Sequence, residues 1–148
     1  MAQMTKLATK LERILLVDDD DDFVLLLKTA FDLSGYHGHI HVVADVPAAI
    51  KSFTRGPPAA LPQLVLLDLK LSPGSGFDLL RWLRARSEFR LIPVYILTGI
   101  QAEADEHLAA ELGADKFLVK PLEFSRLLSI AEQVCAEAVE YSLAHQTG

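Results

Sequence analysis

The sequence of 148 residues is poor in several features that mark particular protein classes. It has one cysteine, Cys135, so no disulfide can form within the chain, and this suits a reducing compartment such as the cytoplasm. No apolar run approaches the roughly 18 residues that a membrane-spanning helix needs, and the polar first residues lack the apolar core of a secretory signal. The net charge of −6 argues against a nucleic-acid surface. These absences predict a cytoplasmic protein with neither a membrane nor a nucleic acid as partner.

The residues that are present are enough for one domain, because 51% of them are apolar. Short apolar runs between polar residues predict five strands, at 13–17, 37–45, 63–68, 92–99 and 115–120. Helical spacing or helix-start signals predict helices from about 20 to 35 and at 47–53, 77–86, 101–112 and 122–144. One apolar face is expected on the first helix, formed by Phe23, Leu26, Leu27, Ala30 and Phe31.

Five strands that alternate with five helices predict an α/β fold with a doubly wound parallel sheet. We expect one folded domain over residues 12–135, preceded by a flexible arm at 1–11. Residues 136–148 are expected to extend the last helix and end in a tail. Open parallel sheets bind their ligands beyond the carboxyl ends of the strands.

The predicted strand ends carry groups suited to a metal ion and a phosphoryl group. The first strand ends at Asp18 and Asp19, and the later ones at Asp68, Thr98 and Lys120. Carboxylate oxygens are ligands that Mg²⁺ prefers, and lysine can neutralise phosphoryl charge. Asp20, Asp21 and Asp22 continue the acidic run, and we expect them in the loop and first helical turn, where the helix dipole favours negative charge.

Four motifs occur in order: VDD (17–19), LLDLKLSPGSG (66–76), ILTG (96–99) and GADKFLVKP (113–121). With them the sequence resembles the receiver domains of two-component response regulators, over about residues 12 to 135. It resembles in particular their stand-alone, chemotaxis-regulator-like members. The resemblance implies a flavodoxin-like fold whose five-stranded parallel sheet has the order 2-1-3-4-5.

The resemblance also implies roles for matching positions. Asp68 would be the phosphoryl acceptor. Asp18 and Asp19, with Asp68 and the backbone carbonyl of Lys70, would bind Mg²⁺ or Mn²⁺. Thr98 would bind the phosphoryl group through its hydroxyl.

Three further positions match the last motif. Lys120 would pair with a phosphoryl oxygen, and Phe117 stands where the family keeps its switching aromatic residue. The peptide bond between Lys120 and Pro121 is a candidate for the cis form, as in the family.

The expected function is that of a phospho-acceptor in a histidine–aspartate phosphorelay. A sensor histidine kinase or a histidine phosphotransfer protein would donate the phosphoryl group, and a downstream protein would read the result. The domain would promote its own phosphorylation and dephosphorylation, without being an enzyme that acts on a separate substrate.

Two other functions stay open from the sequence. The first is a receiver-like interaction domain that is not phosphorylated. The second is a small phosphohydrolase of the haloacid-dehalogenase type, which also uses an Asp nucleophile. Asp18 and Asp20 have the spacing of such an enzyme, but Asp22 stands where a small or β-branched residue is wanted.

Several features depart from the family pattern or lie outside it. Ser72 replaces the usual proline and Pro73 follows it, so the loop is expected to take its own path. Ile100 is apolar and bulky, which predicts slow loss of the phosphoryl group.

Two segments have alternative interpretations. His37, His39 and His41 alternate, which suits an exposed edge strand and, as an alternative, a transition-metal or pH-sensing site. The last helix is longer than the fold needs, which suits a frayed tail or, alternatively, a surface for a homodimer or a partner.

Overall fold

The computed structural model describes residues 11–99 and 102–147, and it describes side chains up to Glu137. Five strands form one parallel sheet in the order β2-β1-β3-β4-β5, as predicted. The strands are β1 Arg13–Val17, β2 His39–Val43, β3 Leu64–Leu67, β4 Val94–Thr98 and β5 Lys116–Val119. The helices are α2 Asp21–Leu33, α3 Val46–Thr54, η1 Pro58–Ala60 (a 3₁₀ turn), α4 Gly76–Arg84, α5 Glu103–Glu111 and α6 Phe124–Thr147.

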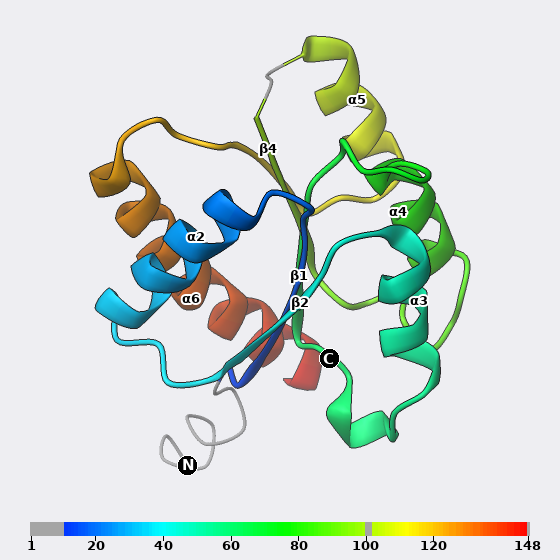
Figure 1. The fold of residues 1–148 in the computed structure, drawn as a ribbon. Coiled ribbons are helices and arrows are strands. Elements are labelled where there is room, and N and C mark those ends of the chain that lie inside the picture. Colours follow the sequence, from blue (N-terminus) through cyan, green and yellow to red (C-terminus); the bar gives the residue numbers. More distant parts are fainter. Residues whose placement is uncertain (1–10, 100–101, 148) are drawn as a thin grey trace.

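The sheet is covered by helices on both faces (Figure 1). Helices α2 and α6 pack on one face, and α3, α4 and α5 pack on the other. All residues of β3 and β4 are buried, as are four of the five in β1. These inner strands are mostly apolar because both of their faces meet a helix, whereas the edge strand β2 exposes part of its length.

Helix α2 shows how the sequence selects the face that packs. Phe23, Leu27, Ala30 and Phe31 are buried as predicted, but the prediction for Leu26 was wrong, because 49% of this residue is exposed. At 3.6 residues per turn, Leu26 lies about a quarter turn from the centre of the buried arc. The helix therefore presents leucines to solvent as well as to the sheet.

Three further predictions concern the two ends of the chain and the absence of a membrane-spanning helix. Of the flexible arm predicted at 1–11, residues 1–10 lie outside the described residues, whereas Leu11 is buried in the apolar cluster under α2 and α6 and so belongs to the folded domain. Helix α6 continues to Thr147. No helix of the described segments has both the length and the apolar character that crossing a membrane requires.

The prediction of a cis peptide bond after Lys120 was wrong. Within the described residues the cis bond is the one between Ser72 and Pro73, so the bond between Lys120 and Pro121 is trans. Trans is favoured for bonds that precede proline, by about 0.5–1 kcal/mol. The backbone N–H of Lys120 still donates to the carbonyl of Thr98 at 2.7 Å, so strand pairing continues up to the proline.

An arginine clamp holds the amino ends of the last strands. Arg84, at the end of α4, donates from Nε to the carbonyl of Gly113 at 2.9 Å and from Nη1 to the carbonyl of Ile92 at 2.9 Å. Its Nη2 lies 3.1 Å from Asp115 Oδ2, and the same oxygen accepts the backbone N–H of Val94 at 2.9 Å. One side chain thus joins α4, the start of β4 and the start of β5.

Candidate functional site

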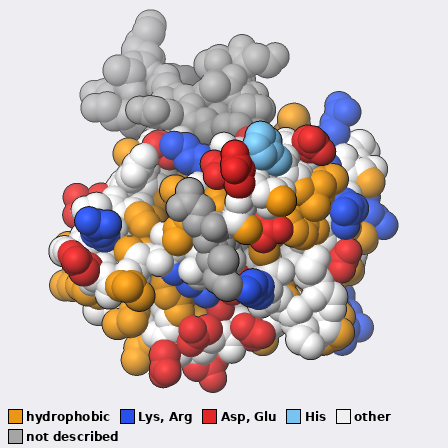
Figure 2. Space-filling model, turned by 90° about the horizontal axis from the view of Figure 1, so that it is seen from above, with side chains coloured by type: hydrophobic (Ala, Val, Ile, Leu, Met, Phe, Trp, Pro, Cys, Tyr) orange, Lys and Arg blue, Asp and Glu red, His pale blue; other side chains and the backbone are white. Residues whose placement is uncertain are grey.

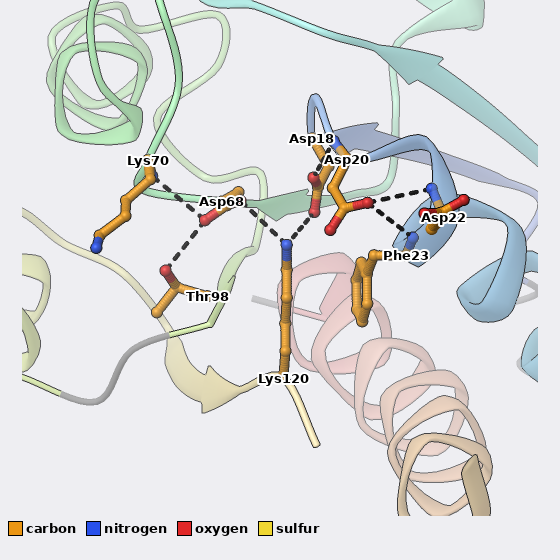
Figure 3. Close-up of polar contacts among 8 residues, drawn as sticks. All are labelled: Asp18, Asp20, Asp22, Phe23, Asp68, Lys70, Thr98 and Lys120. Atoms are coloured by element: carbon orange, nitrogen blue, oxygen red, sulfur yellow. Dashed lines mark hydrogen bonds and ion pairs between the residues drawn. The ribbon is translucent and has the colours of Figure 1, made fainter. Parts of the chain in front are cut away.

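Four side chains converge at the carboxyl ends of the strands, as the sequence predicts (Figure 3). Asp18 follows β1, Asp68 follows β3, Thr98 ends β4, and Lys120 follows β5. Asp18, Asp68 and Thr98 are buried, with exposed fractions of 2%, 6% and 2%. They are the buried polar and charged side chains of the described part of the chain, which marks this end of the sheet as the place where polar chemistry is concentrated.

The backbone of the sheet fixes these side chains in place. The N–H of Asp18 donates to the carbonyl of Val43 at 3.0 Å, and the N–H of Asp68 donates to the carbonyl of Val17 at 3.0 Å. Each aspartate is therefore still paired to the neighbouring strand at the point where its side chain turns inward. Because the backbone of each aspartate is hydrogen-bonded into the sheet, the sheet fixes the point from which each carboxylate projects.

The carboxylate of Asp68 is contacted at both oxygens. Oδ1 accepts the hydroxyl of Thr98 at 3.0 Å and, at 3.3 Å, the backbone N–H of Lys70. Oδ2 accepts Lys120 Nζ at 3.1 Å. In Figure 3 the Lys120 side chain reaches up from the end of β5, so that its ammonium lies between Asp18 and Asp68.

Three carboxylates at this site have the arrangement of a divalent-cation site. Asp18, Asp19 and Asp68 each offer an oxygen, and these oxygens lie within 4.8 Å of one another. Lys120 Nζ lies 2.8 Å from Asp18 Oδ2, but no described residue donates a well-aligned hydrogen bond to that buried oxygen. Hard carboxylate oxygens, one of them incompletely satisfied, fit Mg²⁺ or Mn²⁺.

Burial and charge oppose one another in this site. Burial raises the pKa of Asp18, and the neighbouring Lys120 ammonium reduces this rise without cancelling it. For Lys120, burial alone would lower the pKa, but the carboxylates of Asp18 and Asp68 outweigh it, so the pKa is raised and the amine stays charged at neutral pH. The site holds three carboxylates and one ammonium, which contacts two of them, so the site retains an excess of negative charge that favours a cation.

The remaining aspartates of the acidic run have a structural role, as expected. Asp20 is the N-cap of α2, and its carboxylate accepts the N–H groups of Asp22 at 3.1 Å and Phe23 at 3.2 Å. Asp21 and Asp22 are exposed in the first turn, where the helix dipole favours negative charge. Figure 2 looks down on this end of the molecule and shows acidic side chains gathered at the margin of the face, with exposed apolar side chains beside them.

The family model for the response regulator receiver domain matches residues 14–132 of this chain. The chain belongs to the response regulator receiver family. The matched segment runs from β1 to α6 and includes each residue of the acidic site, Thr98 and Lys120.

Relatives by sequence and solved structures agree with this assignment. The receiver is 32% identical over 123 residues to a probable methanogenesis regulatory protein, FilR2, of Methanothrix harundinacea, covering 82% of this chain and 79% of that protein. It is 36% identical over 121 residues to the sensory transduction protein RegX3 of Mycobacterium tuberculosis, covering 78% of this chain and 47% of RegX3. This chain thus spans about half the length of RegX3 and of several other matched regulators.

Two solved structures have the same fold with different site contents. The Mn²⁺-bound form of response regulator Rcp1 matches with a TM-score of 0.74 at 25% identity, covering 83% of this chain and 91% of that one. The phosphorylated cyanobacterial phytochrome response regulator RcpA matches with a TM-score of 0.75 at 25% identity, covering 83% and 90%. Receiver domains of this type are therefore known in a metal-bound and in a phosphorylated form.

The roles predicted for several other residues of the receiver are not tested by the structure. Phe117 is half-buried and packs against the apolar cluster under α3, α4 and α5, and a switching role remains a prediction. The carbonyl of Lys70 also remains a predicted ligand, and Ile100 lies outside the described residues. His39 and His41 stack with ring centroids 6.4 Å apart and are exposed, but no third ligand joins them among the described residues.

Two residues important to the receiver site were missed by the sequence analysis. Phe23 was assigned to the helix face alone, yet Lys120 Nζ lies over its ring, 4.3 Å from the centroid. Gly76 was treated as part of a turn, yet a Cβ there would collide with the carbonyl oxygen of Asp68 and lie 2.9 Å from Leu69 Cα. The only local signal was the glycine-rich SPGSG segment, and nothing local connects Phe23 to Lys120.

Proposed function

We propose that this receiver accepts a phosphoryl group on Asp68 from a phosphohistidine, carried by a sensor histidine kinase or a histidine phosphotransfer protein. The observation that carries the proposal is the environment of Asp68. Its carboxylate contacts both Thr98 and Lys120 and shares a potential cation site with Asp18 and Asp19.

The chemistry is an in-line displacement at phosphorus. A carboxylate oxygen of Asp68 forms the new P–O bond while the P–N bond to the donor imidazole breaks, and the imidazole keeps the electron pair and takes up a proton from solvent. When bound, Mg²⁺ or Mn²⁺ would neutralise charge on the carboxylates and on the phosphoryl oxygens. The product is an acyl phosphate, which is labile and suits a transient signal.

The contacts of Asp68 also provide a route from phosphorylation to a change of surface. Lys120 Nζ and the Thr98 hydroxyl now bind the carboxylate, and both would move to oxygens of the phosphoryl group. Thr98 ends β4, so its displacement would pull the loop that leads to α5. Such a shift, together with Phe117, would bias a two-state surface that a downstream protein recognises.

The exposed leucines of α2 and of the segment before α6 suit the phosphoryl donor as a docking partner. Leu25, Leu26 and Leu33 of α2 have exposed fractions of 66%, 49% and 66%, and Leu122, just before α6, is fully exposed. Helices α2 and α6 pack together, so these side chains belong to one side of the molecule. An apolar helical surface of the donor would cover them while its phosphohistidine reaches Asp68. A homodimer through α6 remains a further prediction.

The proposed function is that of a signalling module and not of an enzyme that turns over a separate substrate. A dehalogenase-type phosphohydrolase needs a second aspartate near the nucleophile for proton transfer. Asp20 has the required spacing from Asp18, but its carboxylate is committed to two backbone N–H groups of α2. The structure therefore gives the hydrolase alternative no support.

The proposal is tested by incubating the protein with acetyl phosphate and Mg²⁺ and measuring its intact mass over time. We expect the gain of one phosphoryl group, lost on removal of the metal with a chelator and absent in Asp68→Asn. Asp22→Asn is a matched control, because Asp22 is exposed and lies outside the carboxylate cluster. An unchanged mass gain in Asp68→Ala would refute the assignment of the acceptor.

A further inference from the structure

Lys120 has a third neighbour besides its two carboxylates. Its Nζ lies 4.3 Å from the centroid of the Phe23 ring, over the face of that ring. Figure 3 shows the ring alongside the lysine side chain, on the side of α2. The ammonium thus has carboxylates of Asp18 and Asp68 within 2.8 Å and 3.1 Å, and an aromatic face at a third position.

Both partners of this contact are withdrawn from solvent. Phe23 is 8% exposed, and the Lys120 side chain is 13% exposed. The face of an aromatic ring carries partial negative charge and attracts a cation, and this attraction grows when water is excluded. A ring in this position also occupies space into which a flexible lysine side chain could otherwise turn.

The acidic run holds the ring in position. The Asp20 carboxylate accepts the backbone N–H of Phe23 at 3.2 Å, and the backbone N–H of Asp20 donates to Asp18 Oδ1 at 2.9 Å. The start of α2 is therefore connected by hydrogen bonds to a carboxylate that faces Lys120. Phe23 also belongs to the apolar cluster under α2 and α6, and this packing restricts its ring further.

We infer that Phe23 is a positioning residue for phosphoryl transfer: its ring holds the Lys120 ammonium in the orientation that meets the incoming phosphoryl oxygens. The inference rests on the proposed function, because Lys120 has a phosphoryl group to meet only if Asp68 accepts one. Phe23 itself touches neither the acceptor carboxylate nor the donor. Its effect passes through Lys120 alone.

The test compares Phe23→Leu, which keeps an apolar side chain without a ring, with Phe23→Tyr, which keeps the ring. With acetyl phosphate and Mg²⁺, we expect Phe23→Leu to take up the phosphoryl group about three- to tenfold more slowly, and Phe23→Tyr to keep the rate within about twofold. The Mg²⁺ affinity of both variants should equal that of the unmodified protein, because Phe23 is not part of the carboxylate cluster.

A spectroscopic readout follows Lys120 directly. In the NMR spectrum, the ring current of Phe23 should shift the Lys120 Hε protons upfield. We expect the shift to persist in Phe23→Tyr and to vanish in Phe23→Leu. The shift establishes the contact in solution, and the rate of phosphoryl uptake then tests whether this contact positions the ammonium.

Phe31→Leu is the matched control within the same helix. Phe31 is fully buried and packs on Tyr36 rather than on the lysine. It should lower stability in urea without slowing phosphoryl uptake by the folded protein. If Phe23→Leu reacts as fast as the unmodified protein, or if Phe31→Leu slows it equally, the positioning role is overturned while the proposed function stands. If the unmodified protein gains no phosphoryl group, the proposed function itself fails.

Discussion

Lys120 is the residue on which the charge balance of the site depends. Its ammonium lies between two carboxylates that the fold has removed from water, and it is itself mostly buried. Removing one partner from a buried ionic group leaves the other charges uncompensated, which costs more than the pair contributes. The stability of the domain and the chemistry of the site are therefore linked through one side chain.

We predict that Lys120→Met destabilises the protein by about 3 kcal/mol in metal-free buffer, because Asp18 and Asp68 lose their counter-charge. Urea unfolding at neutral pH measures the loss. Added Mg²⁺ should restore part of it, since the cation replaces the missing positive charge.

Lys70→Met is the control for this prediction, because Lys70 is exposed and its side chain forms no ion pair within the described residues. Its unfolding free energy should change by less than about 0.5 kcal/mol. Equal losses in the two variants would contradict the assignment of Lys120 as the counter-charge.

A second residue-scale prediction concerns Tyr36, at the turn between α2 and β2. Burial raises the pKa of its hydroxyl from 10.0 to about 12. The unfolded chain therefore ionises first as the pH rises, so the stability contributed by the neutral hydroxyl is complete below pH 10 and is lost between about pH 10 and 12. In urea unfolding across this range, Tyr36→Phe should show a smaller fall in stability than the unmodified protein. Parallel curves would contradict it.

At the scale of elements, the positions and types of all five strands and the main helices were predicted from local patterns, whereas the order of the strands in the sheet came from the family resemblance. Inner strands such as β1 and β3 are short, apolar and bounded by polar residues, and these properties are visible in any window of the sequence. The extent of the buried face of a helix was harder to predict, as Leu26 of α2 shows. The width of that face depends on the elements that pack against it, which the local sequence does not give. The prediction of a cis peptide bond after Lys120 was also wrong. It was taken from the family pattern and not from the residues around the bond.

The site was predicted from the sequence as far as its strand-end residues are concerned. Asp18, Asp68, Thr98 and Lys120 converge because parallel strands place all of their carboxyl ends at one edge. The contacts of Phe23 with Lys120 and of Gly76 with Asp68 join segments distant in the sequence. Such contacts depend on distances between elements, and no periodicity or motif encodes them.

The start of α4 gives an element-scale prediction. Gly76 packs so closely on the backbone of Asp68 and Leu69 that Gly76→Ala must displace α4 or the acceptor strand. We expect a loss of about 1–3 kcal/mol in urea unfolding, as for other overpacked sites, and slower phosphoryl uptake by Asp68.

Gly99→Ala is the matched comparison, because a Cβ at Gly99 meets no atom of the other described residues within 4 Å and the backbone there is not left-handed. It should change stability by less than about 0.5 kcal/mol. A Gly76→Ala protein as stable as Gly99→Ala would show that α4 is not held against the acceptor strand.

For the whole molecule, the cluster of carboxylates predicts coupling between metal binding and folding. A cation that binds only the folded state stabilises it by about 2.7 kcal/mol at a concentration 100-fold above its dissociation constant. Thermal unfolding with and without Mg²⁺ should therefore show a higher Tm with the metal. The increase should largely disappear in Asp19→Ala, because Asp19 is exposed and contributes to the site without supporting the core.

Asp22→Ala controls for general effects of Mg²⁺ on acidic proteins, since it removes an exposed carboxylate next to the site but outside the cluster. It should keep the full increase in Tm. If Asp19→Ala and Asp22→Ala respond to Mg²⁺ alike, the ion binds elsewhere.

The arginine clamp has a consequence for how a signal crosses the molecule. Arg84 ties α4 to the starts of β4 and β5 at the end of the sheet opposite to the acidic site. If phosphorylation displaces Thr98 as proposed, Arg84 would keep the amino ends of β4 and β5 in register while their carboxyl ends tilt. In that case, the surface proposed to bind a partner would change shape while the packing at the opposite end of the sheet stays intact.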